Sequence, residues 1–141
     1  MPIYRYQKKS DAYTTYNLAA PDGAQELCTI DGWTYVHVPD GLALPPQPAQ
    51  IAAEPVLLDT ALRERIKAIS PQCRLIHRRM EEKIREKYSL ADEQYYSRIG
   101  VGVALGLYQF QPGEAEELQA FGAFVESVRE WGRAQRAELG L

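Results

Sequence analysis

Two hydrophobic patterns divide the chain. In residues 1–39 the apolar and aromatic positions form short alternating runs, the first over residues 3–8, which is typical of β-strands. From residue 56 onward apolar side chains recur every three or four positions, which indicates helices. The segment between them, residues 40–55, contains four prolines and predicts an extended linker. We therefore expect an α+β fold: a small N-terminal antiparallel β unit (1–39), a Pro-rich linker (40–55) and an α-helical unit of three to four helices (56–141).

The clearest local signal in the first part is a β-hairpin. Asp31 and Gly32 separate two β-rich runs, and this dipeptide is typical of a two-residue type I′ turn. Counting outward from the turn pairs Ile30 with Trp33 and Cys28 with Tyr35. Both faces of this hairpin are largely apolar, and an isolated hairpin is only marginally stable. We therefore expect it to pack against the helices or against another subunit.

Capping residues set the expected helix limits. Asp59 or Thr60 begins a helix that runs to about residue 69, and Ser70 followed by proline begins a second, to about residue 88. Ser89 begins a third helix, whose continuation is weakened by Gly100, Gly102 and Gly106. A last helix is expected over residues 114–139, with Gly140 as its stop.

Charge and composition narrow the function classes. The chain has 141 residues and a net charge of −3, carried by residues 1–55, whereas residues 56–141 are balanced. We therefore do not expect non-specific electrostatic binding of nucleic acid. We see no secretory signal, and the longest apolar run, residues 99–108, is shorter than the roughly 20 residues that cross a bilayer. The two cysteines fit a reduced intracellular protein. We expect neither nucleic acid nor membrane as a partner.

No residue pattern identifies a reaction. Cys28, His37, Cys73 and His77 could form a tetrahedral zinc site if the sheet packs on the second helix, but their spacing matches no standard zinc motif. The simpler interpretation makes the cysteines small core residues and leaves the histidines partly exposed. The spacing GxGxxxG at residues 100–106 differs from a dinucleotide loop and follows a helix, so it favours close packing or a bend. We therefore predict no catalytic residue, no cofactor and no metal, hence no enzyme.

Aromatic residues are the candidate contact groups. The chain has nine tyrosines, and four of them lie within residues 4–16. Tyrosine and tryptophan are enriched in protein interfaces because they bury much area and keep a polar tip. A sheet this small has little interior, so interface and core are equally open interpretations. The predicted protein interface consists of Tyr4, Tyr6, Trp33 and Tyr35.

Several phrases of the sequence resemble a known group of proteins. They are DGWTYVHVPDG with the following LPPQP, then ISPQCRLIHRRMEEKIREKYSLADEQYYSRIG and VESVREWGRAQRAELGL, the most distinctive parts being residues 84–93 and 131–141. They resemble small uncharacterised proteins encoded in tailed-phage and prophage tail gene clusters. No catalytic motif belongs to this resemblance.

The resemblance implies a function in protein assembly. We expect a non-enzymatic structural or adaptor protein of the tail, baseplate or fibre, assembled in the host bacterial cytoplasm and located in the virion. Its partners would be other tail or fibre proteins, in a homo-oligomer or a hetero-complex. One alternative is a tail-fibre assembly chaperone, because Trp131 followed by basic residues is similar to those proteins. Another is a small zinc-dependent enzyme or regulator built on the cysteines and histidines named above.

Overall fold

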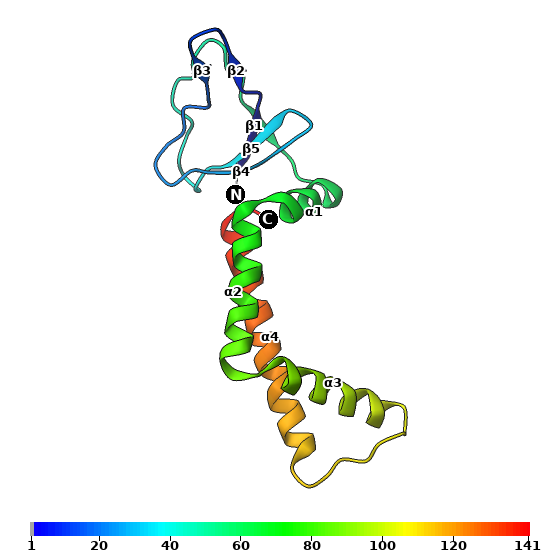
Figure 1. Ribbon diagram of the computed structural model, residues 1–141. Coiled ribbons are helices and arrows are strands. Elements are labelled where there is room, and N and C mark those ends of the chain that lie inside the picture. Colours follow the sequence, from blue (N-terminus) through cyan, green and yellow to red (C-terminus); the bar gives the residue numbers. More distant parts are fainter. Residues whose placement is uncertain (1) are drawn as a thin grey trace. The chain divides into compact units, whose positions relative to one another are not determined.

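The fold is α+β, as expected from the sequence. The computed structural model describes residues 2–141, and within this range the chain forms six strands and four helices (Figure 1). The chain divides into two compact units. Unit 1 comprises residues 1–75 and returns at residues 135–141, and unit 2 comprises residues 76–134. The helices α2 and α4 each contribute residues to both units.

Unit 1 is built on a four-stranded antiparallel sheet of order β4-β5-β1-β6. Its strands are β1 (Ile3–Tyr6), β4 (Gln25–Ile30), β5 (Trp33–His37) and β6 (Glu54–Val56). Two further short strands, β2 (Lys9–Ser10) and β3 (Thr15–Tyr16), pair only with each other.

The β4–β5 hairpin follows the register that the sequence predicts. Asp31 and Gly32 both have positive φ, 52° and 80°, as a type I′ turn requires. Ile30 pairs with Trp33 and Cys28 with Tyr35, so these two predictions are confirmed. A bulge between Glu26 and Cys28 then shifts the register. Because of this irregularity, Leu27 and Cys28 are both buried although they are neighbours in the strand.

The Pro-rich segment contributes to the core of unit 1. Ile51 is buried in one cluster with Tyr6, Val36 and Val38, and Leu44 packs partly against it. Its last residues form β6, which pairs antiparallel with β1 in the register Ile3 to Val56. Segment 40–56 therefore covers and extends the sheet.

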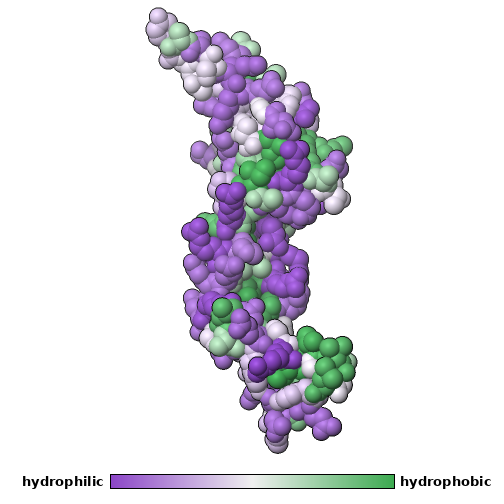
Figure 2. All heavy atoms as spheres, turned by 45° about the vertical axis from the view of Figure 1, so that its right-hand side comes forward, coloured by the Kyte–Doolittle hydropathy of each residue, from purple (hydrophilic) through white to green (hydrophobic). Residues whose placement is uncertain are grey.

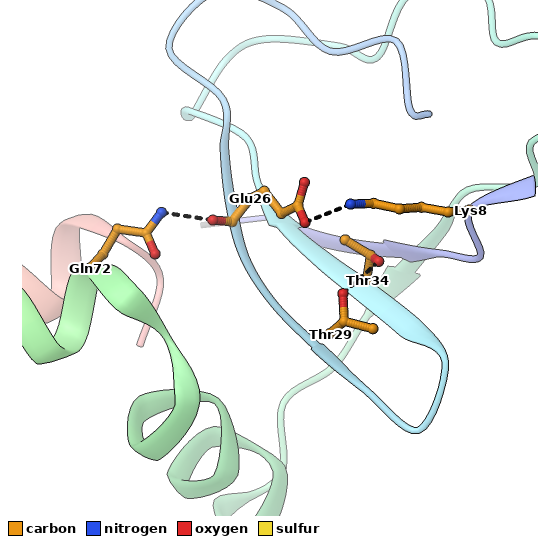
Figure 3. Close-up of polar contacts among 5 residues, drawn as sticks. All are labelled: Lys8, Glu26, Thr29, Thr34 and Gln72. Atoms are coloured by element: carbon orange, nitrogen blue, oxygen red, sulfur yellow. Dashed lines mark hydrogen bonds and ion pairs between the residues drawn. The ribbon is translucent and has the colours of Figure 1, made fainter. Parts of the chain in front are cut away.

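Helix α1 (Thr60–Ile69) and the start of α2 (Pro71–Lys87) also belong to unit 1, and both contact strand β4. The Asp59 carboxylate caps α1 by accepting the backbone N–H of Leu62, and α1 packs against β4. The Gln72 side chain donates a 2.7 Å hydrogen bond to the carbonyl of Glu26 in β4. Figure 3 shows this contact beside the bonds from Lys8 to the Glu26 carboxylate and between Thr29 and Thr34. These polar groups connect β4 to α2 and to β5.

The last residues of the chain return to the sheet of unit 1. Leu139 is buried, and Gly140 adopts a φ of 78° that stops α4. A Cβ placed on Gly140 would lie 3.3 Å from Ile3 and 3.4 Å from His37. The strands β1 and β5 therefore pack closely against this turn.

Unit 2 consists of helices, all of which begin where the sequence predicts. They are the main part of α2, all of α3 (Leu90–Ala104) and most of α4 (Glu114–Glu138). Ser89 and Asp92 form the capping box of α3. The Tyr96 and Phe121 rings stack at 5.0 Å between α3 and α4. Gly132 lies against Met80 of α2, and Gly100 lies against Leu118.

Candidate protein interface

The four aromatic residues predicted as an interface differ in accessibility. Tyr6 and Tyr35 are buried within unit 1, 2% and 4% exposed. Tyr4 and Trp33 are partly exposed, and the Arg5 guanidinium lies 4.2 Å from the centre of the Trp33 ring. Arg5 also forms an ion pair with Glu54 in β6. Among the four, only Tyr4 and Trp33 have surface that a partner could contact without unfolding the sheet.

The cysteine and histidine residues have separate environments. Cys28 and Cys73 are buried free thiols, and burial raises the pKa of each. The buried His37 has no hydrogen-bond partner at either ring nitrogen, and burial lowers its pKa. His77 is exposed and lies 3.2 Å from Glu81 on the same helix. Within residues 2–141, no three histidine, cysteine or carboxylate side chains are grouped so that they could hold a metal ion.

The helices of residues 2–141 include none that is both long and apolar enough to span a bilayer. The apolar run at residues 99–108 instead forms the end of α3 and the start of the loop to α4.

This loop exposes a group of apolar side chains. Leu107 is 81% exposed, Leu105 67% and Val101 59%, and Phe110 is also accessible. We call these four residues the apolar tip. Figure 2 shows apolar side chains gathered at the surface in the lower part of the view, where the end of α3 and the loop lie. Contiguous apolar surface of this kind on a folded protein usually marks an interaction site.

Backbone contacts fix the shape of the loop. The carbonyl of Gly102 accepts hydrogen bonds from the backbone N–H groups of Leu107 and Tyr108, at 2.8 and 3.2 Å. Gly106 has a φ of 73°, which suits glycine and reverses the chain direction. A Cβ on Gly102 would lie only 2.8 Å from the Cβ of Tyr108. The loop therefore packs directly on α3 at a position that only glycine accommodates.

A buried carboxylate holds the other end of the loop. Glu114, the first residue of α4, is 7% exposed and accepts hydrogen bonds from the Tyr108 hydroxyl and the Gln111 backbone N–H, both at 2.6 Å. The Tyr95 hydroxyl of α3 donates to the same carboxylate. A negative charge in the first turn is also favoured by the helix dipole. These three donors connect α3, the loop and α4, so the loop that carries the apolar tip is hydrogen-bonded at both of its ends.

Charged residues of opposite sign flank the apolar tip in the sequence, with the exposed Arg98 before it on α3 and glutamates after it. None of residues 99–113 is charged, and the chain has no lysine or arginine between Arg98 and Arg129. The loop is followed at once by Glu116 and Glu117, which are exposed in the first turn of α4. The tip is thus an uncharged apolar surface between a basic residue on α3 and the acidic first turn of α4.

A second surface feature of unit 2 is an open groove between α2 and α4. Lys83, Phe124 and Trp131 line it, among other residues. The Lys83 ammonium lies 4.7 Å from the Trp131 ring centre, and the Lys87 ammonium lies 4.8 Å from the Phe124 ring centre. Because these cations already cover the rings, the groove offers less free apolar surface than the tip does.

Sequence reasoning did not identify the apolar tip. In the sequence, residues 99–108 indicate only an apolar run too short for a bilayer span and a glycine-spaced packing segment. The second of these interpretations is confirmed by the close approach of Leu118 to Gly100 and of Tyr108 to Gly102. The overlooked signal is an uncharged run of 15 residues containing leucines on both sides of Gly106.

Comparison with protein-family models, with curated proteins and with solved structures finds no match to this chain.

Proposed function

We propose that this protein is a non-enzymatic structural or adaptor protein that acts through protein–protein contacts, as a component of a phage or prophage tail. The observation that carries the contact function is the apolar tip, which is exposed and held in place by the Gly102 and Glu114 hydrogen bonds. A rigid apolar surface suits binding because its ordering cost is paid during folding rather than during association.

The free energy available from burying the apolar tip supports binding to a specific partner. Completing the burial of Val101, Leu105 and Leu107 from their present exposure would contribute about 3–6 kcal/mol. This contribution is large enough to act as the centre of an interface, where a few residues carry most of the binding energy. Tyr4 and Trp33 on unit 1 are also partly exposed, but they lie on opposite faces of the sheet.

The assignment to a tail rests on the sequence phrases that resemble proteins of tail gene clusters. A structural component and an assembly chaperone both require protein contacts, so the apolar tip suits either. The two differ in their fate, because a structural component stays in the finished particle and a chaperone leaves it.

The first test measures complex formation in solution. Light scattering would give the mass of the purified chain alone and after mixing with the products of neighbouring genes. We expect a defined complex that Leu107→Ser weakens, whereas Leu57→Ser serves as the matched control because Leu57 is 98% exposed on unit 1. A monomer that binds none of these products would contradict the proposed function. Presence of the chain in purified particles would support the structural component, and absence would favour the chaperone.

A further inference from the structure

We propose that residues 139–141 form a closure over the β-sheet of unit 1 and that protonation of the buried His37 ring releases this closure. We call these three residues the closing turn. The strands stay paired when the closing turn leaves, so the response to acid is a local opening of the fold. The proposal concerns unit 1 alone and does not rest on the proposed function.

His37 lies beneath the closing turn on an inner strand of the sheet. It is the last residue of β5 and pairs with Ile3 of β1 and with Gln25 of β4. A Cβ placed on Gly140 would lie 3.4 Å from Cδ2 of His37 and 3.3 Å from Cδ1 of Ile3. Gly140 therefore covers the edge of the ring at Cδ2, the carbon that is bonded to Nε2.

The imidazole ring is buried without a polar partner. It is 4% exposed, and within residues 2–141 neither Nδ1 nor Nε2 of His37 has a hydrogen-bond partner. A neutral imidazole carries one donor and one acceptor, and leaving such groups unpaired in a protein interior is unfavourable. Protonation makes both nitrogens donors and adds a charge, so the closed arrangement becomes less favourable still. The closed arrangement therefore selects the neutral ring.

The charged groups around the ring do not offset its burial. Burial is the largest effect and lowers the pKa of His37, whereas Asp40, three residues further along the chain, raises this pKa. The amino group of residue 1 also lowers the pKa. The cross-strand partners Ile3 and Gln25 are uncharged, and the closing turn presents Gly140 to the ring. The net result is a pKa below the usual value for histidine.

The backbone N–H groups of the closing turn do not hold it to the sheet. Those of Leu139 and Leu141 donate to the carbonyl of Arg136, and that of Gly140 donates to the carbonyl of Ala137. Both acceptors belong to α4, so releasing the turn from the sheet breaks none of these hydrogen bonds. The ladder between β1 and β5 does not involve the turn either. A local opening therefore retains the hydrogen bonds of both elements.

The direction of the response follows from proton linkage. In the open state water reaches the ring of His37, and its pKa returns to about 6.5. In the closed state its pKa is lower. The closure is therefore strongest above a pH of about 6.5 and weakens as the pH falls towards the closed-state pKa. Between the two pKa values the ratio of open to closed molecules should rise by up to about tenfold per pH unit.

NMR spectroscopy of the full-length chain tests this proposal, with labelled isoleucine and leucine methyl groups and labelled histidine, between pH values of about 7.5 and 4.5. We expect the methyl signals of Leu139 and Ile3 to change with the same midpoint as the ring signal of His37. Ile51 packs with Val36, which precedes His37 and points to the opposite face of the sheet. The Ile51 methyl signal should stay constant and thereby report that the sheet is folded.

Two pairs of variants link the response to the ring and to the closing turn. His37→Gln should abolish the change at Leu139, whereas His77→Gln should leave it unaltered because His77 is exposed. Gly140→Ala introduces strain at a φ of 78° and crowds the sheet, so it should loosen the closure and raise the midpoint towards about 6.5. Gly113→Ala introduces the same kind of strain at a φ of 86°, but its Cβ meets no atom of the described residues within 4 Å. This variant should leave the midpoint unchanged.

Four results would overturn the proposal. One is a titration of His37 during which the Leu139 and Ile3 signals stay constant, since the closed sheet would then accommodate the proton. A second is a simultaneous change at Ile51, which would indicate unfolding of the whole unit. A third is the same transition in His37→Gln, which would assign it to other groups. The fourth is a ring that stays neutral over the whole pH range.

Discussion

Gly102 offers a sharp test of how the apolar tip is held. Alanine there places a Cβ 2.8 Å from the Cβ of Tyr108, an atom that cannot swing away because it is bonded to the loop backbone. Relief of this overlap costs about 1–3 kcal/mol, against a gain of about 1 kcal/mol from replacing glycine in a helix. We therefore expect Gly102→Ala to lower the free energy of unfolding by up to about 2 kcal/mol.

Gly122 provides the matched control on α4. It is exposed, and a Cβ built on it meets no atom within 4 Å. Gly122→Ala should therefore raise the free energy of unfolding by up to about 1 kcal/mol. The two substitutions are chemically identical and should have opposite signs.

Urea unfolding followed by circular dichroism measures both changes, and amide hydrogen exchange reports on the loop itself. In Gly102→Ala the N–H groups of Leu107 and Tyr108 should exchange faster, because their shared acceptor is the Gly102 carbonyl. In Gly122→Ala their exchange should be unchanged. If Gly102→Ala stabilises the protein as Gly122→Ala does and leaves loop exchange unaltered, the tip is not fixed by this contact.

Two further predictions concern unit 1. Burial disfavours the imidazolium of His37 and lowers its pKa. The free energy of unfolding should therefore be highest above the unfolded pKa near 6.5 and should fall as the pH drops through the folded pKa. His37→Gln should remove this pH dependence from the urea midpoint, and an equal pH dependence in both proteins would assign it to other groups. Cys28 and Cys73 are buried with raised pKa values, so a thiol reagent should modify both slowly in the native state and rapidly in urea; fast modification without urea would show that the β4–α2 contact opens readily.

Local signals in the sequence predicted the elements well. The Asp31-Gly32 turn determines the hairpin register from two adjacent residues, and the Ser89 capping box lies within four residues. Both depend on contacts between near neighbours, which a sequence displays directly. The helix start at Asp59 and the helix end at Gly140 likewise depend on residues that are close in the sequence.

Long-range contacts explain what the sequence did not reveal. Glu54 and Pro55 fall in the predicted linker and Val56 begins the predicted helical unit, yet the three residues form the edge strand β6, a position that tolerates proline. The burial of Tyr6 depends on Ile51, 45 positions away in the chain. The sequence shows that both faces of the hairpin are apolar, but it does not show which of these side chains other parts of the same chain bury.

The candidate site was hidden for the same reason. Glu114 looked like an ordinary acidic residue in a first helical turn, and its second role depends on Tyr95, which lies 19 positions earlier. Exposure of Leu105 and Leu107 likewise depends on the loop conformation fixed by Gly102 and Gly106. An uncharged run shows that apolar residues are present but not whether they are covered.

The division of unit 1 between residues 1–75 and 135–141 has a consequence for synthesis on the ribosome. Leu139, which is buried in unit 1, is translated only after every residue of unit 2. Nascent domains generally fold in order from the N-terminus, but here the unit that is translated first is the last to become complete. A nascent chain that has already formed α3 still lacks the segment that closes against Ile3 and His37. Pauses in translation before residue 135 would therefore leave the part of the sheet at Ile3 and His37 uncovered for longer.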